Sequence, residues 1–523
     1  MKPINKILVF ALLAVAFTAC KKSFLDRPSN SQISSNNFYK STTDLRLATA
    51  SLYGGSHWFA FHSQSMLTLG DILSGNATFP WNGDIVQLYT RTITPQNAII
   101  SNGWTGLYNV IAQCNTVISA IKKADPSVST ADKNAAIAEA RFIRAIAYYH
   151  LAVYWGAVPI IEDNAKLLSD PLLNRNVVSD VYKFVANDLT YAAQNLPKTD
   201  QTGRVTTWSA QGMLGKVYLT MSGVDKSGSR DQALLDSAKK YAGNVCKNSG
   251  LALFSNYYNL FKPQFNDSPE SLFALQWQAG TGYANGNAWQ TYSPSGDINP
   301  GKNGAWIPFS PNYELYQLYS EKDSIRLKAS MFLTGVHYPE LNAAGGGFTA
   351  TMVAMKKHII GNEKDNNAPT MDFWSSPEHN SVLRLADVYL IYAEAILGND
   401  ASTSNGEALT YFNAVRERAG VDHVTSLDFN TILKERRVEL VFEGQYWIDL
   451  VRYSYYNPQG AVNNLNNQKR GTFIYDKATK TAKRDTTFVA PALPATISSF
   501  TLPIPASEMT ADPKLAQPPV PYY

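Results

Sequence analysis

The chain has 523 residues and a formal net charge of only +4, with 45% hydrophobic and 17% charged residues. This composition describes a folded chain able to bury a large core. It excludes a nucleic-acid binder that works through a basic surface, because no basic run and no zinc-binding spacing occurs. Aromatic residues reach 12%, with 29 Tyr and 10 Trp. Such rings suit surfaces that are both apolar and hydrogen-bonding, so their excess indicates binding.

The first 19 residues have the pattern of a signal peptide. Lys2 and Lys6 precede an uncharged apolar stretch, residues 7–17, which is too short to span a bilayer comfortably. The small pair Thr18-Ala19 then precedes Cys20, which resembles a bacterial lipobox, where the thiol is diacylated and the cysteine becomes the first residue of the mature protein. The alternative is an ordinary secretory signal with an incidental cysteine. We predict lipid attachment at Cys20, which two acyl chains make stable, and a polar tether over residues 20–37.

Helical periodicity dominates the first half of the chain. Apolar residues recur at i, i+3 and i+4 in segments 97–124 and 131–156, and Gly156 with the nearby Pro159 marks a helix end. Two amphipathic helices this close predict a helical hairpin. Further segments share the pattern: 177–197, 207–221, 231–250, 383–400 and 406–420. The sequence therefore predicts a mainly α fold.

Small residues within these helices suggest how the helices pack. They stand among Tyr and Leu, at positions where small side chains let helices approach closely: Gly212, Gly215, Ala386, Ala393 and Ala395. Their placement resembles that of tetratricopeptide-like hairpins, in divergent and interrupted copies. Cys114 and Cys246 are far apart and form no CxxC motif, so we expect each to be a small buried thiol in its helix.

Two segments break the helical pattern and have loop chemistry. Residues 70–91 and a longer stretch within 256–380 are rich in Gly, Asn, Pro and Ser, with aromatic residues among them. Loops that present aromatics and amides on a rigid scaffold are where recognition usually occurs. We therefore expect the ligand site here. The proline-rich tail, 502–523, is expected to form an extended strap over the surface.

Six segments together resemble a known family. They are "SFLDRPSN" and residues 139–161, 383–395, 413–420, 432–453 and 502–509, in that order along the chain. The chain resembles the RagB/SusD family of outer-membrane nutrient-binding lipoproteins. The resemblance implies a SusD-like fold with a signal peptide (1–19), a lipidated tether (20–37), an N-terminal helical region (38–255) and a C-terminal region with ligand loops and closing helices (256–523).

The resemblance also implies a function. Members of the family bind oligosaccharides, or in some cases peptides, without catalysis, and deliver them to a SusC-like TonB-dependent outer-membrane transporter. The protein would be anchored by lipid in the outer membrane and face the cell exterior. The sequence lacks the acidic pair that follows the cysteine in some exported relatives, so outward exposure is implied by the family alone. No nucleic-acid partner is expected.

Sugar chemistry selects candidate ligand residues in the two loop segments. Pyranose rings stack their C–H faces on aromatic rings, while their hydroxyls need amide, carboxylate or guanidinium partners. The candidates are Asp71, Asn76, Trp81, Asn82, Trp289, Tyr292 and Trp306, with Tyr89 and Arg91 in reserve. Each aromatic residue either contacts ligand or packs against the scaffold, and the sequence leaves both open.

Two other functions fit parts of the sequence. A glycoside hydrolase needs two carboxylates across a cleft, for which Asp71 and Asp84 are the available pair. A pure adaptor would use the helical repeats for protein contact alone. The sequence predicts no cofactor and no metal, because HExxH, P-loop and dinucleotide motifs are missing and a faint calcium-like alternation has a misplaced glycine: Asp297, Asn299, Gly301 and Asn303.

A charged stretch near the C-terminus, residues 434–453, carries the family's structural signature. On one continuous predicted helix, Glu435, Glu439 and Glu443 recur every four residues and repel one another unless cations intervene. We predict that arginines lie between them, including Arg436, Arg437 or Arg384 from another helix. The residues of the signature are Glu435, Arg436, Arg437, Glu439, Glu443, Trp447, Asp449 and Arg452.

Overall fold

The computed structural model describes residues 38–79, 82–279, 284–292, 298, 308–342, 345–361, 375–485, 487 and 491–523. Several sequence predictions therefore concern residues outside the described part: Cys20, Trp81, Asp297, Asn299, Gly301, Asn303 and Trp306. Within the described part, no helix combines the length and the apolar character that a membrane span requires.

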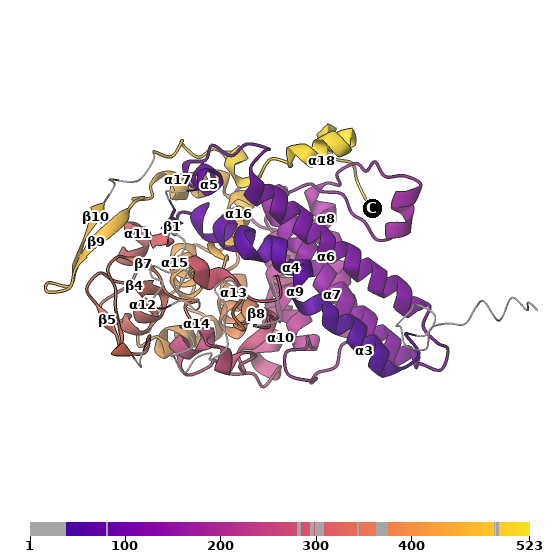
Figure 1. Cartoon of the computed structure of the whole chain (residues 1–523), viewed down its shortest axis with the longest axis horizontal. Helices are drawn as coiled ribbons and strands as arrows, with labels where there is room; N and C mark the ends of the chain where they lie inside the picture. Colours follow the sequence, from indigo (N-terminus) through magenta and orange to yellow (C-terminus); the bar gives the residue numbers. More distant parts are fainter. Residues whose placement is uncertain are drawn as a thin grey trace, which may run out of the picture.

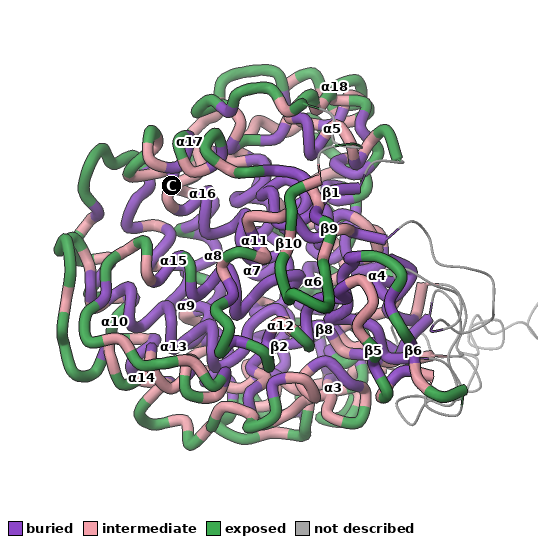
Figure 2. Tube along the Cα trace, turned by 90° about the vertical axis from the view of Figure 1, so that its left-hand side faces the viewer, coloured by how far each residue is buried: buried purple, intermediate pink, exposed green. Residues whose placement is uncertain are grey.

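In the part of the chain that the structure describes, seven long helices form the scaffold. Each contacts the next in the order α6 Ala98–Lys122, α7 Thr130–Trp155, α8 Val178–Asn195, α9 Thr207–Met221, α10 Gln232–Asn248, α13 Leu385–Leu397 and α14 Gly406–Arg418. In Figure 1, α6 and α7 run side by side on the right of the molecule. The mainly α prediction is confirmed. Figure 2 shows the buried interior of the trace and the exposed turns around it.

Local sequence explains the ends of these helices. Helix α7 begins after Ser129, whose side chain accepts the backbone N–H of Asp132. It ends at Gly156, which adopts a positive φ of 68°. The predicted small-residue packing also occurs: a Cβ on Gly215 would lie 2.9 Å from the Cβ of Ala242 in α10. Close contact between α9 and α10 therefore requires glycine at position 215.

Shorter helices complete the two halves of the chain. They are α3 Thr42–Ala50, α4 Ser56–Ala60, α5 Gly83–Thr90, α11 Tyr313–Gln317, α12 Ser324–Ser330, α15 Phe429–Glu439, α16 Tyr446–Tyr456, α17 Pro458–Asn466 and α18 Ala506–Ala511, with π-helical turns at Phe61–Met66 and Thr68–Ile72. The C-terminal strap is confirmed as a surface segment, although it contains the short helix α18. Cys114 is buried and Cys246 half-buried, and both are free.

Among the described residues, ten short strands form antiparallel pairs between the helices. The pairs are β1 Ala77–Thr78 with β3 Ser310–Pro311, β2 Ser271–Leu275 with β8 Asn380–Arg384, β4 Met331–Phe332 with β7 Ala354–Met355, β5 His337–Tyr338 with β6 Phe348–Thr349, and β9 Thr472–Asp476 with β10 Thr481–Asp485. Pairs β1–β3 and β2–β8 connect segments that are far apart in sequence. Pair β1–β3 fixes the two predicted loop regions to the same part of the fold.

The prediction of one continuous helix over 434–453 is wrong. Helix α15 ends at Glu439 and α16 begins at Tyr446. Between them Phe442 and Gly444 have φ values of +59° and +73°, which a right-handed helix does not allow. The turn packs against Gly70, where a Cβ would lie 2.2 Å from the Cα of Gly444. A tertiary contact, which periodicity does not report, interrupts the helix.

Candidate functional site

The flanks of the two predicted ligand loops meet in space. Strand β1 pairs with β3 in the register Thr78 to Ser310. Immediately after β1, the ring of Phe79 lies 5.3 Å from that of Phe309. Tyr292, on the other side of the second loop, stacks on Phe309 at 4.1 Å. The described residues next to both loops therefore form one aromatic cluster.

The aromatic ring of Trp289 is held inside this region by two histidines. It stacks on His62 at 4.6 Å with an interplanar angle of 3°, and its Nε1–H donates to the His62 carbonyl oxygen at 2.7 Å. His358 meets it edge-on at 4.7 Å. Burial lowers the pKa of His62 to about 3, so this ring is neutral at physiological pH. Trp289 and Tyr292 are each only 1% exposed, and both rings pack against the scaffold. The sequence had left open whether each ring contacts ligand or packs against the scaffold.

A series of hydrogen bonds holds the backbone of Trp289 in place. The backbone N–H of Trp289 donates to the side-chain oxygen of Asn287 at 2.9 Å, and the Asn287 amide donates to the backbone oxygen of Glu378 at 3.1 Å. A carboxylate oxygen of Glu378 lies 2.7 Å from Nδ1 of His358, whose Nε2 is 2.7 Å from the carbonyl oxygen of Phe442. This series links the flank of the second loop to the turn between α15 and α16.

The side chains of Asp71 and Asn76 form hydrogen bonds inside the fold and are not displayed on the surface of the first loop. Asp71 accepts hydrogen bonds from the Asn76 amide and from the backbone N–H groups of Phe442 and Gly444. Asn76 accepts from Arg437 at 2.8 Å. Both side chains are fully buried, so the expectation that the loop displays them is wrong. Burial raises the pKa of Asp71 to about 6, although the hydrogen bonds oppose the rise.

The remaining candidates of the first loop have different surroundings. Asn82 is exposed and caps helix α5 by accepting the N–H groups of Asp84 and Ile85. Tyr89 is buried, and Arg91 donates to the carbonyl oxygen of Leu493 at 2.6 Å. Because Asp71 is sealed from solvent, it cannot form a cleft pair with Asp84, and the geometry expected of a glycoside hydrolase is not met by these two carboxylates.

A groove that the sequence prediction missed lies next to the Trp289 cluster. Its volume is about 570 Å³, and its walls include Gln276, Trp277, Gln278, Asn285 and His379. Trp277 contacts the ring of His62 at 4.3 Å. The signal for this groove was present as the triplet "QWQ", an aromatic between two amides. It directly follows strand β2, so the pattern suggests a strand end rather than a binding surface.

Within the described residues, no cluster of three His, Cys, Asp or Glu side chains has a geometry that holds a metal ion. The charged side chains that do converge belong to the structural signature. Arg384 lies 2.6 Å from Glu439, 2.8 Å from Glu443 and 2.7 Å from Glu270. Arg326 contacts Glu435 at 2.6 Å and Glu439 at 3.2 Å. Burial alone raises the pKa of Glu439, but the surrounding arginines outweigh it and lower the pKa to about 2.

The predicted arginine positions are therefore partly confirmed. Arg384 lies between Glu439 and Glu443 as predicted. The prediction is wrong for Arg436, which pairs with Asp387 and Asp449 at 2.7 and 2.9 Å, and for Arg437, which pairs with Glu314 at 2.6 Å. The signature ties α13, α15 and α16 together through buried ion pairs, with Arg452 joining Asp449 to Glu394 and Trp447 stacked on Phe500.

Comparison with known proteins shows which family has this architecture. Residues 328–523 match the model of the SusD family, and residues 23–219 match a model described as starch-binding associating with outer membrane. A SusD-like protein of Bacteroides ovatus is 38% identical over 540 residues, which cover 99% of this chain and 98% of that protein. The chain belongs to the SusD family. The SusD-like fold expected from the sequence motifs is thereby confirmed.

Two solved structures and one further relative extend the comparison. A crystal structure with xylogluco-oligosaccharide superposes with a TM-score of 0.85 at 37% identity, covering 92% of this chain and 99% of that chain. A laminarin-binding SusD-like protein has a TM-score of 0.67 at 22% identity, covering 91% and 98%, which supports the shared fold alone. A SusD-like protein of Formosa agariphila is 25% identical over 490 residues, 88% of this chain and 93% of that protein.

Proposed function

We propose that this SusD-family protein binds an oligosaccharide at the cell surface and acts without catalysis. The observation that carries the proposal is the relative solved with xylogluco-oligosaccharide, which matches the chain over almost its whole length. A pocket or platform for sugar needs aromatic rings with amides around them. The cluster at the loop flanks and the neighbouring groove contain both kinds of side chain.

The ligand platform is proposed to include Trp81 and Trp306. Trp81 follows Phe79 by two positions and Trp306 precedes Phe309 by three. Phe79 and Phe309, the described residues near these two tryptophans in the sequence, are in ring contact, which supports the choice of both loops for one platform. Asn82 follows Trp81 directly and is exposed. Trp289 and Tyr292 then act chiefly as the packed support of this platform.

Delivery of the ligand is proposed to follow the scheme of the family. Cleavage before Cys20 and diacylation of its thiol would anchor the protein in the outer membrane, facing outward, on the tether 20–37. From there the protein would hand its oligosaccharide to a SusC-like TonB-dependent transporter. Exchange of Cys20 for Ala tests the anchor, because the variant protein should leave the membrane fraction.

Affinity electrophoresis and calorimetry with xylogluco-oligosaccharide and laminarin oligosaccharides test the binding proposal. Trp81→Ala and Trp306→Ala should each reduce affinity about fivefold or more, since stacking of one ring on an aromatic contributes about 1 kcal/mol or more. Tyr523→Ala is the matched control, because Tyr523 is an exposed aromatic at the far C-terminus. Unchanged retardation of both tryptophan variants contradicts the site, and new reducing ends in the incubation contradict a purely binding role.

A further inference from the structure

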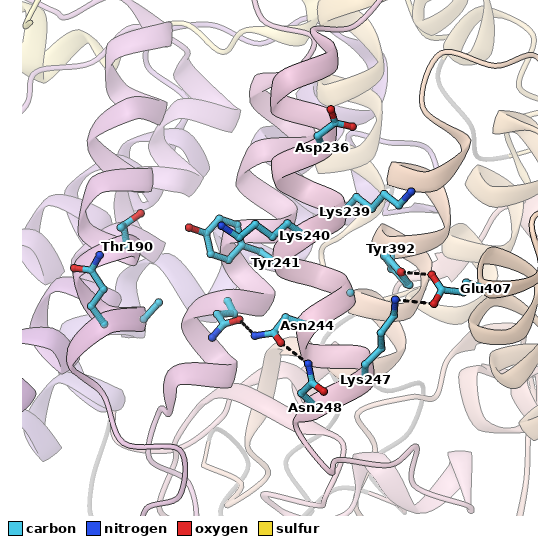
Figure 3. Close-up of a pocket in the computed structure, with 14 residues that line it drawn as sticks. Thr190, Asp236, Lys239, Lys240, Tyr241, Asn244, Lys247, Asn248, Tyr392 and Glu407 are labelled. Atoms are coloured by element: carbon cyan, nitrogen blue, oxygen red, sulfur yellow. Dashed lines mark hydrogen bonds and ion pairs between the residues drawn. The ribbon is translucent and has the colours of Figure 1, made fainter.

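A second polar groove lies on the helical scaffold, away from the loop cluster. It has a volume of about 770 Å³ over helix α10 and is lined from α8, α9, α10, α13 and α14. This volume falls in the range of small-molecule binding sites. None of the residues of the proposed loop platform line it. Figure 3 shows Tyr241 and Asn244 on the side of α10 that faces Thr190 of α8, with Lys247 and Glu407 on the other side.

A row of amide side chains crosses the α8 side of this groove. Asn248 donates to the side-chain oxygen of Asn244 at 2.6 Å, and Asn244 in turn donates to Gln211 of α9. Asn244 uses one donor and its acceptor oxygen in this row, and Asn248 uses one donor, so further donors and acceptors are left for a ligand. Sugar hydroxyls also donate and accept together, which makes them suitable partners for this row.

The same side of the groove contains a rigid aromatic surface. The ring of Tyr241 stacks on Tyr218 of α9 at 5.6 Å with an interplanar angle of 6°. Both residues are half-buried, so the pair is fixed by the scaffold and still reaches solvent. A ring held in this way can take the C–H face of a pyranose without losing further side-chain freedom.

The charged side chains of the groove are three lysines and two carboxylates: Lys239, Lys240, Lys247, Asp236 and Glu407. The Nζ of Lys240 lies over the ring of Tyr241, 5.4 Å from the ring centroid. It forms no ion pair with any residue that the structure describes. Across α10, Lys247 is already paired with Glu407 at 2.6 Å. An anionic group bound beside Tyr241 would therefore meet a cation that has no carboxylate partner within the described chain.

We propose that this groove is a second saccharide site, which takes an oligosaccharide containing carboxylate groups. The amide row bonds its hydroxyls, Tyr241 stacks on one ring, and Lys240 pairs with a carboxylate. The site goes beyond the proposed function, because it shares no residue with the loop platform. It would let the protein hold an acidic branch or a second segment of a long glycan while the loops hold the first.

Calorimetry with tetragalacturonate, and with neutral cellotetraose for comparison, tests the proposal. The double variant Asn244→Ala with Asn248→Ala should lose about tenfold or more in affinity for tetragalacturonate, the loss expected for one or two hydrogen bonds. Lys240→Ala should weaken tetragalacturonate and leave cellotetraose unchanged. Lys434→Ala, an exposed helical lysine outside the groove, is the matched control. Thermal unfolding of each variant establishes that it is folded.

The loop variant separates this proposal from the first one. Trp81→Ala should keep its affinity for tetragalacturonate, even if the loop platform binds no sugar at all. The proposal is overturned if wild type does not bind tetragalacturonate, if binding survives in both groove variants, or if Trp81→Ala alone abolishes it. A selective loss in the groove variants, with salt-dependent affinity in wild type, supports it.

Discussion

The carboxylate of Asp71 accepts the backbone N–H of Gly444 at 3.0 Å and so joins segments 373 residues apart. The other carboxylate oxygen accepts the N–H of Phe442 in the same turn. This contact fixes the base of the first ligand loop to the turn that separates α15 from α16. It explains why this carboxylate, which lies in a segment of ligand-binding composition, is fully buried in the π-helical turn Thr68–Ile72.

The raised pKa of Asp71 predicts a pH-dependent stability. Its pKa rises from 3.8 unfolded to about 6 folded, so folding favours the protonated form. The stabilising contribution is fully present below about pH 4 and is lost as the pH rises through about 6, a change of up to about 3 kcal/mol. Asp71→Asn removes this dependence. Urea unfolding of both proteins at pH 4.5 and pH 7 should show the advantage of wild type shrinking at pH 7; a constant difference contradicts the prediction.

Replacement of Gly70 by Ala is expected to disrupt the same contact. The added Cβ would lie 2.2 Å from the Cα of Gly444, and the backbone there cannot yield cheaply. We expect a loss of at least about 3 kcal/mol in the free energy of unfolding, or no folded protein. Gly83→Ala is the control, because nothing lies within 4 Å of its Cβ. Equal unfolding midpoints for the two variants would sink this account.

Exchange of Glu439 for Gln should reduce stability far more than glycan affinity. Glu439 is fully buried and pairs with Arg326, Arg384 and Arg418. Removal of its charge leaves these guanidinium groups undercompensated, which costs about 3 to 5 kcal/mol for a buried pair. Chemical unfolding measures this loss, and calorimetry with oligosaccharide measures affinity. Glu417→Gln, on an exposed side chain, should change neither; a larger effect of Glu439→Gln on affinity than on stability contradicts the structural role.

Asn287 is predicted to hold the flank of the second loop. Asn287→Ala removes the acceptor of the Trp289 N–H and the donor to Glu378. Hydrogen exchange over residues 284–292 should become about tenfold faster or more, as for the loss of one or two hydrogen bonds, with global stability less affected. Oligosaccharide affinity should fall in parallel. Asn463→Ala on the exposed face of α17 is the control, and unchanged exchange at Trp289 would refute the supporting role.

The sequence by itself determined the helices and the family. Periodicity is a local property, because the buried face of a helix consists of apolar residues that are three and four positions apart. The stripes in α6 and α7 therefore predicted real helices. The motifs from 432 to 453 likewise indicated the SusD family, although the helix drawn through them was too long.

Only the tertiary structure decided which candidate residues face a ligand. Asp71 and Asn76 have the chemistry of sugar-binding residues, yet partners more than 360 positions away bury them. Trp289 lies in a segment of loop composition, but His62 and His358, which are distant in sequence, enclose its ring. The groove beside "QWQ" and the amide row on α10 arise from neighbouring elements as well. Burial depends on contacts between distant segments, and residue type and spacing do not encode those contacts locally.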